Sequence, residues 1–498
     1  MNLFYMTVKP QKILFLILAS ALLVRLYHIH APIIGMHSWR QGDTAAIARN
    51  FHENGYKLFY PQIDWGGNSQ GYVESEFQIY PFLVSLLYSI FGVHEALGRI
   101  LSAIFSLLAI YLLYLFVKRY LGEKTALWSA FIFSFLPLNI YYTRTFMPEG
   151  TLLMAIMLGM YLFSKWLDTE RKTCLIFSAL SISIACMIKL HTLYIGLPLL
   201  SLAWMKYGRK TLCQGTLWFY AFTIFSPIVL WYLHAHQLYL NHHNTFSIWQ
   251  YGTDKWGNWE MLVTWDYWKK IVILYLAKRH MVWFLVPLFF IGLWVKRHSR
   301  EEKVFDYWLI ANLIFFIIVG KGNYLHEYYQ VPFMLPASAM IGKVFASSWR
   351  RPSLQNKMTL LLCVALLGAS GEGLRRYTLR YMAPESREIS AELRLGEEVR
   401  KKTEPNALVI AVNKSNPSML YNAHRKGWNA SPSEAVDERF LAPRIALGAE
   451  YLIGIHEYFT EESDKRGVEQ LLHSKKYEVI HNDDQAFIVK LSSNLSNK

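Results

Sequence analysis

Residues 98–122, GRILSAIFSLLAIYLLYLFVKRYLG, decide the fold of this chain. A long apolar run follows Arg99 and ends at Lys118 and Arg119, and it approaches the roughly 20 mainly apolar residues that a helix needs to cross a bilayer. Similar runs recur along most of the first 370 positions, and 53% of the 498 residues are hydrophobic and 16% aromatic. This composition predicts an all-α polytopic membrane protein and excludes a soluble enzyme.

Apolar runs of sufficient length predict eleven transmembrane helices. They cover residues 11–30, 100–117, 125–142, 150–166, 174–188, 190–205, 214–234, 281–295, 305–319, 328–346 and 358–372. Pro81 to Gly92 is too short to cross, and it begins with a proline, which the first turn of a helix favours. We therefore predict a juxtamembrane helix for this segment.

The basic residues predict the orientation of the chain. The formal net charge is +15, and much of it gathers in five clusters between apolar runs: Lys118-Arg119 with Lys124, Lys165 with Arg171-Lys172, Lys206 with Arg209-Lys210, Lys296-Arg297 with Arg300, and Arg350-Arg351 with Lys357. With a cytoplasmic N-terminus, all five fall on the cytoplasmic side, as the positive-inside rule requires. If Pro81 to Gly92 crossed the membrane, the first two would lie outside. The charge therefore indicates topology in a plasma (inner) membrane, and no nucleic-acid partner is expected.

The first apolar run argues against a signal peptide, and the cysteines argue against a disulfide or zinc framework. Ile13 to Val24 lacks a small-residue cleavage signature, so we expect a retained helix and not a signal peptide. The four cysteines, Cys174, Cys186, Cys213 and Cys363, lie in or beside apolar runs without metal-ligand spacing. We expect neither a disulfide framework nor a zinc site.

Two domains are predicted. Residues 1–372 form the transmembrane domain, whose outer side carries the first loop (31–99), the turn from Arg144 to Glu149 and the segment 235–280. Residues 373–498 are rich in Glu, Lys, Arg and Asn, with short β-like runs at 407–412, 451–455, 477–480 and 486–491. This tail predicts a small extracytoplasmic α/β domain.

The first outer loop holds the leading catalytic candidate. Asp43 lies in Arg40-Gln41-Gly42-Asp43-Thr44 just after the first predicted helix, and Glu74 and Glu76 follow later in the loop. Carboxylates here can accept a proton from an acceptor hydroxyl. A hydrated loop acid is the common alternative, but Trp39 and the nearby helix end favour a partly buried Asp43 with a shifted pKa.

Three further sites combine polar groups at the outer face. Residues 141–150, YYTRTFMPEG, contain Arg144 and Glu149, for which an interfacial ion pair is the alternative. Residues 321–329, KGNYLHEYY, precede Pro332 and Pro336, and their cation and hydroxyl groups suit a lipid phosphate. Snorkelling to the membrane surface is the alternative there. Lys189 interrupts an apolar stretch at an outer turn.

The order of these parts resembles the GT-C superfamily of polyprenyl-phosphate-sugar glycosyltransferases. Within it, the resemblance is to the family 39 type, which includes protein O-mannosyltransferases and lipid A aminoarabinose transferases, and it covers residues 1–345. The shared order is one helix, a large outer loop with an early acid, a helix beginning at proline, and Gly98-Arg99 before a long apolar run. An Arg five residues before an acid matches Arg144 and Glu149. A His-Tyr-Tyr-Pro-Pro pattern matches His326, Tyr328, Tyr329, Pro332 and Pro336.

The resemblance implies a GT-C fold and an inverting transfer of sugar from a polyprenyl-phosphate donor to an extracytoplasmic acceptor hydroxyl, with Asp43 as general base. Glu149 corresponds to a second catalytic acid that is usually Asp. The predicted substrate-binding residues are Arg40, Glu74, Glu76, Arg144, Lys189, Lys321, His326, Tyr328 and Tyr329. Thr44 stands where mannosyltransferases have a second acid, and Ile79-Tyr80-Pro81 replaces a longer family element. Some relatives bind a divalent ion, but too few acids cluster here to predict a metal or another cofactor.

Two other functions explain part of the sequence. A transporter or flippase of lipid-linked sugars would account for the helices and basic turns, but the expected midplane charges and internal repeats are missing from the sequence. A membrane scaffold would leave the outer acids without a role. Lipid, glycan and protein acceptors all stay open.

Overall fold

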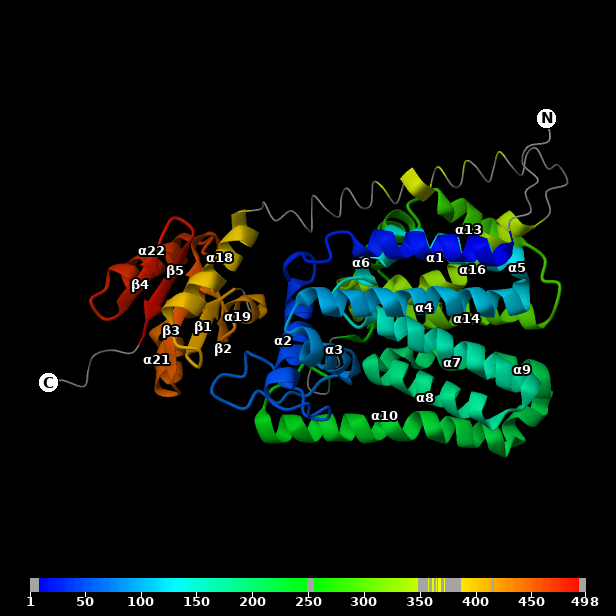
Figure 1. Cartoon of the computed structure of the whole chain (residues 1–498), viewed down its shortest axis with the longest axis horizontal. Helices are drawn as coiled ribbons and strands as arrows, with labels where there is room; N and C mark the ends of the chain where they lie inside the picture. The colour runs from blue at the N-terminus through cyan, green and yellow to red at the C-terminus, as the bar shows by residue number, and fades with distance from the viewer. Residues whose placement is uncertain are drawn as a thin grey trace. The chain divides into compact units, whose positions relative to one another are not determined.

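The computed structural model describes residues 9–248, 255–347, 387–413 and 416–491, together with a few positions between 357 and 371 (Figure 1). The chain forms two compact units. The helical unit contains Met1–Ile29, Arg99–His234 and Ser247–Tyr377, and the α/β unit contains His30–Gly98, Ala235–Phe246 and Thr378–Lys498. The C-terminal segment thus shares its unit with the first outer loop, and the proposed domain boundary at 372 stays a prediction.

Helices occupy the predicted apolar segments of the helical unit. They are α1 (Pro10–Leu26), α4 (Glu95–Leu121), α5 (Glu123–Phe135), α6 (Pro137–Tyr142), α7 (Glu149–Thr169), α8 (Lys172–Ile188), η1 (Leu190–Ile195), α9 (Gly196–Tyr207), η2 (Gly208–Cys213), α10 (Gly215–His242), α11 (Trp259–Leu262), α12 (Trp265–Trp268), η4 (Lys269–His280), α13 (Leu285–Trp294), η5 (Glu301–Lys303), α14 (Val304–Ile318), α15 (Gly320–Leu325), η6 (Glu327–Phe333) and α16 (Met334–Ala346). The predicted crossing 358–372 lies largely outside the described residues.

Several predicted crossings are interrupted in the structure. The segment 125–142 divides into α5 and α6 at Pro137, whose ring fixes φ and which lacks the N–H for a continuous helix. Among the described residues, α4, α7 and α10 are long and apolar enough to cross a membrane, and a bent pair covering Trp265–His280 and Leu285–Trp294 would make a fourth. These helices support an integral membrane protein. The count of eleven and the orientation stay predictions.

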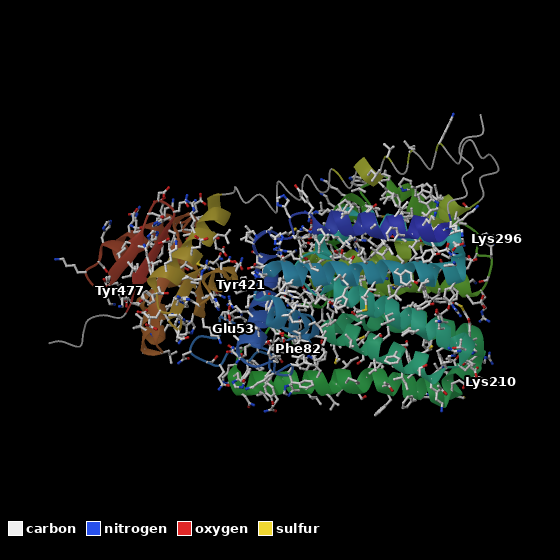
Figure 2. The ribbon with its side chains drawn as sticks, viewed as in Figure 1. Glu53, Phe82, Lys210, Lys296, Tyr421 and Tyr477 are labelled. Atoms are coloured by element: carbon white, nitrogen blue, oxygen red, sulfur yellow. The ribbon has the colours of Figure 1, made fainter. Side chains whose placement is uncertain are left out.

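Close helix packing in the helical unit depends on small residues. A Cβ atom at Gly150 of α7 would lie 2.5 Å from the carbonyl oxygen of Ser102 in α4, so the two backbones approach too closely for alanine. Gly342 of α16 similarly packs against α5, where a Cβ would lie 2.6 Å from Ser129 Oγ. Lys210 and Lys296 lie at the same end of this unit (Figure 2), as charge alternation predicts for two of the basic clusters.

The C-terminal part of the α/β unit contains a five-stranded sheet in the order β2-β1-β3-β5-β4. Its strands are β1 (Leu408–Val412), β2 (Lys426–Ala430), β3 (Ala449–Ile455), β4 (Glu478–Asn482) and β5 (Ala486–Lys490). β2, β1 and β3 are parallel, and β5 is antiparallel to β3 and β4. Four strands overlap the predicted β-like runs. β2 was not predicted, because Lys-Gly-Trp-Asn-Ala shows no apolar alternation.

Helices cover the sheet, and the strands β1, β3 and β5 are buried along most of their length, whereas β4 is largely exposed. The helices are α18 (Arg387–Lys402), α19 (Ser418–Ala423), α20 (Pro432–Ala435), α21 (Glu438–Ala446) and α22 (Glu462–His473). Val409 and Ala411 of β1 belong to one core cluster, whereas Ile410 and Val412 belong to the other. Alternate strand residues point to opposite faces, so β1 reads as a continuous apolar run.

The first outer loop adds α2 (Ser38–Glu53) and α3 (Ile79–Phe91) to the α/β unit. α3 is the helix predicted from Pro81, although its position relative to a membrane stays a prediction. α2 packs against both α3 and α19. Gly42 allows a close approach at the contact with α19, because a Cβ there would lie 3.2 Å from Ser418 Cα and would require the neighbouring backbone to shift by a few tenths of an ångström. α2 carries Asp43.

Candidate active site

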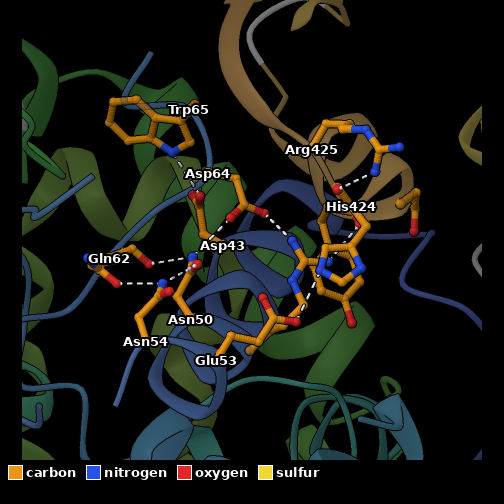
Figure 3. A network of polar contacts seen from close by, with 12 residues as sticks. Asp43, Asn50, Glu53, Asn54, Gln62, Asp64, Trp65, His424 and Arg425 are labelled. Atoms are coloured by element: carbon orange, nitrogen blue, oxygen red, sulfur yellow. Dashed lines mark hydrogen bonds and ion pairs between the residues drawn. The ribbon is translucent and has the colours of Figure 1, made fainter. Parts of the chain in front are cut away.

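Asp43 lies inside α2 and its side chain is buried, with 5% of the residue exposed. Trp65 Nε1 donates a hydrogen bond to Asp43 Oδ1 at 2.9 Å (Figure 3). Burial raises the pKa of Asp43 from 3.8 to about 7, while the Trp65 hydrogen bond and the Arg40 charge oppose this rise and the Asp64 charge adds to it. A carboxylate with this pKa is a stronger base than a solvated aspartate and is still ionised in part near neutral pH.

The predicted substrate-binding residues of the first loop lie in the same α/β unit. Arg40, one helical turn before Asp43, forms an ion pair with Glu76 at 3.3 Å. Glu74 is fully buried and accepts a hydrogen bond from the Thr245 hydroxyl. His236 Nδ1 lies 3.4 Å from Glu74 Oε1. Glu74 therefore holds the loop against the segment 235–246, whereas Arg40 and Glu76 lie nearer the helical turn that carries Asp43.

A second buried network in the α/β unit involves residues that sequence reasoning did not select. Asp64 accepts hydrogen bonds from Arg49 Nη2 at 2.6 Å and from Asn50 Nδ2 at 2.9 Å. Arg49 also donates to the backbone oxygen of Tyr421 in α19 at 3.0 Å. Arg49 and Asn50 are six and seven residues, or about two helical turns, beyond Asp43 on α2, so the helical period would have placed them near the Asp43 face of the helix. The network fixes the helix that carries the candidate base (Figure 3).

In the helical unit, Glu149 and Lys189 form a buried ion pair. Lys189 Nζ lies 2.6 Å from Glu149 Oε1, and the two side chains are 5% and 2% exposed. Glu149 is the first residue of α7, where the partial positive charge of the helix end favours a carboxylate. Glu149 Oε2 is also buried and accepts no hydrogen bond from the described residues. This oxygen is available to a hydroxyl donor.

Aromatic rings surround the ammonium group of Lys189. Its Nζ lies 4.5 Å from the ring centre of Tyr328 and 5.0 Å from that of Tyr329, so both rings favour the positive charge. His326 stacks on Tyr328 with ring centres 5.3 Å apart. The structure therefore brings together Glu149, Lys189, His326, Tyr328 and Tyr329, which come from three separate sequence motifs.

The two other predicted substrate-binding residues of the helical unit are Arg144 and Lys321. Arg144 donates to the backbone oxygens of Arg25, at 2.9 Å, and Tyr27. It therefore ties the end of α1 to the turn before α7. Lys321 lies on α15 with an exposed side chain.

Sequence reasoning missed Glu327, which is buried next to the selected His326. Glu327 accepts a hydrogen bond from the Tyr142 hydroxyl at 2.8 Å and forms an ion pair with Arg279. The charged pair Lys278-Arg279 was visible in the sequence, but its partner was not. Across the described residues, no three His, Cys, Asp or Glu side chains form a group that could hold a metal ion.

Known proteins share this architecture. A family model described as dolichyl-phosphate-mannose-protein mannosyltransferase matches residues 78–231. The structure of ArnT from Cupriavidus metallidurans bound to undecaprenyl phosphate is similar over 97% of this chain and 98% of its own, with a TM-score of 0.67 and 12% identity. The oligosaccharyltransferase AglB from Archaeoglobus fulgidus, in complex with an inhibitory peptide and a dolichol-phosphate, is similar over 94% and 72%, with a TM-score of 0.59 and 12% identity.

The chain has the GT-C fold. The predicted resemblance to the GT-C superfamily is confirmed. No curated protein sequence matches the chain. The family match includes Arg144, Glu149 and Lys189, whereas Asp43 precedes it and His326 follows it. The α/β unit thus contains a buried carboxylate, and the helical unit contains an acid and several cations. These are the chemical groups that a transfer from a phosphate leaving group requires.

Proposed function

We propose that this chain is an integral membrane glycosyltransferase that moves a sugar from a polyprenyl-phosphate donor to an extracytoplasmic acceptor hydroxyl with inversion. Support comes from the match to the mannosyltransferase model and from the fold shared with ArnT bound to undecaprenyl phosphate. The observation that carries the proposal is the buried Asp43 carboxylate, held by Trp65 on a helix of the α/β unit. Its role as general base is the part of the proposal that mutation tests most directly.

Asp43 accepts the proton of the acceptor hydroxyl as the acceptor oxygen attacks the anomeric carbon. The bond between that carbon and the phosphate oxygen breaks, and its electron pair leaves with the polyprenyl phosphate. One displacement inverts the anomeric centre. Among the described residues, Trp65 is the hydrogen-bond donor to Asp43, and it binds Oδ1, so Oδ2 is available for the acceptor proton. The protonated carboxyl then returns its proton to water.

The cations of the helical unit stabilise the leaving phosphate. Lys189 and Arg279 are held by Glu149 and Glu327, and His326 lies against the same tyrosines as Lys189. Fixed cations stabilise the negative charge that develops on the leaving group, and this electrostatic effect is often the largest contribution to catalysis. Lys321 adds an exposed cation. Glu149 orients a substrate hydroxyl through its available Oε2 atom.

Reconstitution of the purified protein in liposomes tests the function. A panel of radiolabelled polyprenyl-phosphate sugars is supplied with a membrane extract as acceptor source, and labelled product is separated from the donor lipid. We expect transfer by the wild type and by Asp484→Asn, an exposed acid-to-amide control, but loss of transfer in Asp43→Asn. Label that crosses the bilayer still attached to its lipid would identify a flippase instead. Label that is neither transferred to an acceptor nor carried across the bilayer would refute the proposal for that donor panel.

A further inference from the structure

The α/β unit contains a polar cavity of about 360 Å³ at the far end of α2 from Asp43. Its walls come from the last turns of α2, from Asp64, and from the segments 405–408 and 424–426. Cavities of 300 to 1,000 Å³ are typical of small-molecule sites. None of the residues selected from the sequence lines this cavity.

The charges in its wall do not balance. Glu53 pairs with His424 at 3.0 Å, and Asp64 pairs with Arg49 at 2.6 Å. Arg425 and Lys426 also line the cavity, and neither forms an ion pair with any described residue. An anion therefore fits the cavity better than a cation. The two carboxylates in the wall disfavour a dianion, so a single negative charge fits best.

The remaining polar groups match a ligand rich in hydroxyls. Arg49 is 4% exposed, and its buried Nε atom donates to no described residue. The amide hydrogens of Asn50 and Asn54 already donate to Gln62, Asp64 and Asn50, but the two amide oxygens keep lone pairs for hydroxyl donors, as do the carboxylates of Glu53 and Asp64. Neutral amides, carboxylates and one arginine donor are suited to sugar hydroxyl groups.

The cavity is connected to Asp43 through one short network (Figure 3). Asn50 follows Asp43 by seven residues on the same helix, which is about two turns or roughly 10 Å. Asp64 accepts from Arg49 and Asn50, and the adjacent Trp65 donates to Asp43. A saccharide bound in the cavity thus lies along the face of α2 that leads to the base.

We propose that this cavity binds a sugar carrying one carboxylate, of the uronic acid type, as part of the acceptor. This inference rests on the proposed function, because it assigns the acceptor of that same transfer. The carboxylate lies against Lys426 and Arg425, and the sugar hydroxyls contact Arg49, Asn50 and Asp64. The site is then a specificity-determining subsite contributed by the C-terminal sheet and the first loop together.

Direct binding to the full-length protein in nanodiscs tests the site without a donor lipid. Glucuronate, glucose and glucose 6-phosphate are titrated and followed by saturation-transfer NMR. We expect saturable binding of glucuronate and a Kd at least about tenfold higher for glucose, which lacks the charge-assisted hydrogen bond worth about 1.5–3 kcal/mol. The Kd of glucose 6-phosphate should also be higher, because the two wall carboxylates repel its second negative charge. Equal or tighter binding of glucose or glucose 6-phosphate would overturn the proposal.

A charge reversal tests the position of the site. Lys426→Glu should raise the Kd of glucuronate at least about tenfold, since the Lys426 side chain makes no hydrogen bond with a described residue and its replacement leaves the backbone pairing of β2 in place. Lys475→Glu is the matched control, because Lys475 is exposed in the same unit and lies outside the cavity. Unchanged binding in Lys426→Glu, or an equal loss in both variants, would contradict the assignment. Glucuronate binding that persists while no donor is turned over would refute the proposed function and leave the subsite standing.

Discussion

The hydrogen bond from Trp65 to Asp43 should control the pH dependence of transfer. Trp65→Phe removes the indole N–H but keeps a ring against Phe246, whose centre lies 6.0 Å from that of Trp65. The hydrogen bond favours the ionised carboxylate and lowers the pKa of Asp43, so its loss should raise that pKa above about 7. The acidic limb of the rate profile should then move to higher pH.

The size of this shift follows from the energy of the bond. A hydrogen bond to a charged group contributes about 1.5–3 kcal/mol, and one pKa unit corresponds to about 1.4 kcal/mol, so the shift is about one to two units. Because Trp65 is half-buried, water can replace part of the lost hydrogen bond to Asp43. We therefore expect the pKa of Asp43 to rise by about one unit. At pH 6 the ionised fraction of Asp43 then falls from about 9% to about 1%, whereas at pH 9 it stays above about 90% in both proteins.

The assay is kcat/KM for sugar transfer between pH 5.5 and 9.5, with circular dichroism at each pH to monitor folding. Trp65→Phe should lose about ninefold relative to the wild type at pH 6 and little at pH 9. Trp294→Phe, which removes an indole from an 88% exposed position, should match the wild type throughout. An unchanged acidic limb in Trp65→Phe, or one displaced to lower pH, would refute the assignment of Asp43 as the titrating base.

Three other variants test the energetics of the two units. Between about pH 4 and 7 the folded state keeps the proton of Asp43, whereas the unfolded state releases it, so the stability of the wild type falls as pH rises through this window. Asp43→Asn should therefore be more stable than the wild type by up to about 4 kcal/mol at pH 8 and equally stable at pH 3. Equal melting temperatures of the two proteins at pH 8 would contradict this. Lys189→Met leaves the Glu149 charge buried without its partner and should lower the free energy of unfolding by about 3–5 kcal/mol. Adding Glu149→Gln to the same chain should restore much of this stability. Additive losses in thermal melts would argue against a coupled pair. Gly427→Ala places a Cβ 1.8 Å from the Val409 carbonyl oxygen at φ +154°, and limited proteolysis should show early cleavage of the C-terminal sheet; a wild-type cleavage pattern would contradict the close β1–β2 contact.

The apolar pattern predicted where helices lie, and it did so because burial and lipid exposure both require apolar residues at those positions. It did not predict α2. The sequence SWRQGDTAAIARNFHE is polar enough to read as a loop, and its helical form is stabilised by partners far along the chain. Asn416 hydrogen bonds Ser38 across 378 residues, and Arg49 reaches the Tyr421 carbonyl across 372. Local propensity carries no information on such contacts.

The chemistry of the candidate site was more predictable than its pairings. Acids and cations at the ends of apolar runs stand out, which is why Asp43, Glu149 and Lys189 were selected. That Lys189 pairs with Glu149, and that Glu74 holds Thr245 and His236, depends on tertiary structure. Glu327 was passed over because a Glu next to a His in an aromatic segment has no distinctive spacing. Its contact with Arg279 gives it a role only in the folded chain.

The most direct test of the account is the single-turnover rate of sugar transfer in Asp43→Asn at saturating donor. General base catalysis contributes about 10²- to 10⁴-fold, so the rate should fall by that factor while the affinity for the donor lipid stays within about twofold of the wild type. The amide keeps the size of the side chain and can still accept the Trp65 hydrogen bond, which preserves the local structure. Transfer at the wild-type rate in a folded, donor-binding Asp43→Asn protein would contradict the claim that Asp43 is the base.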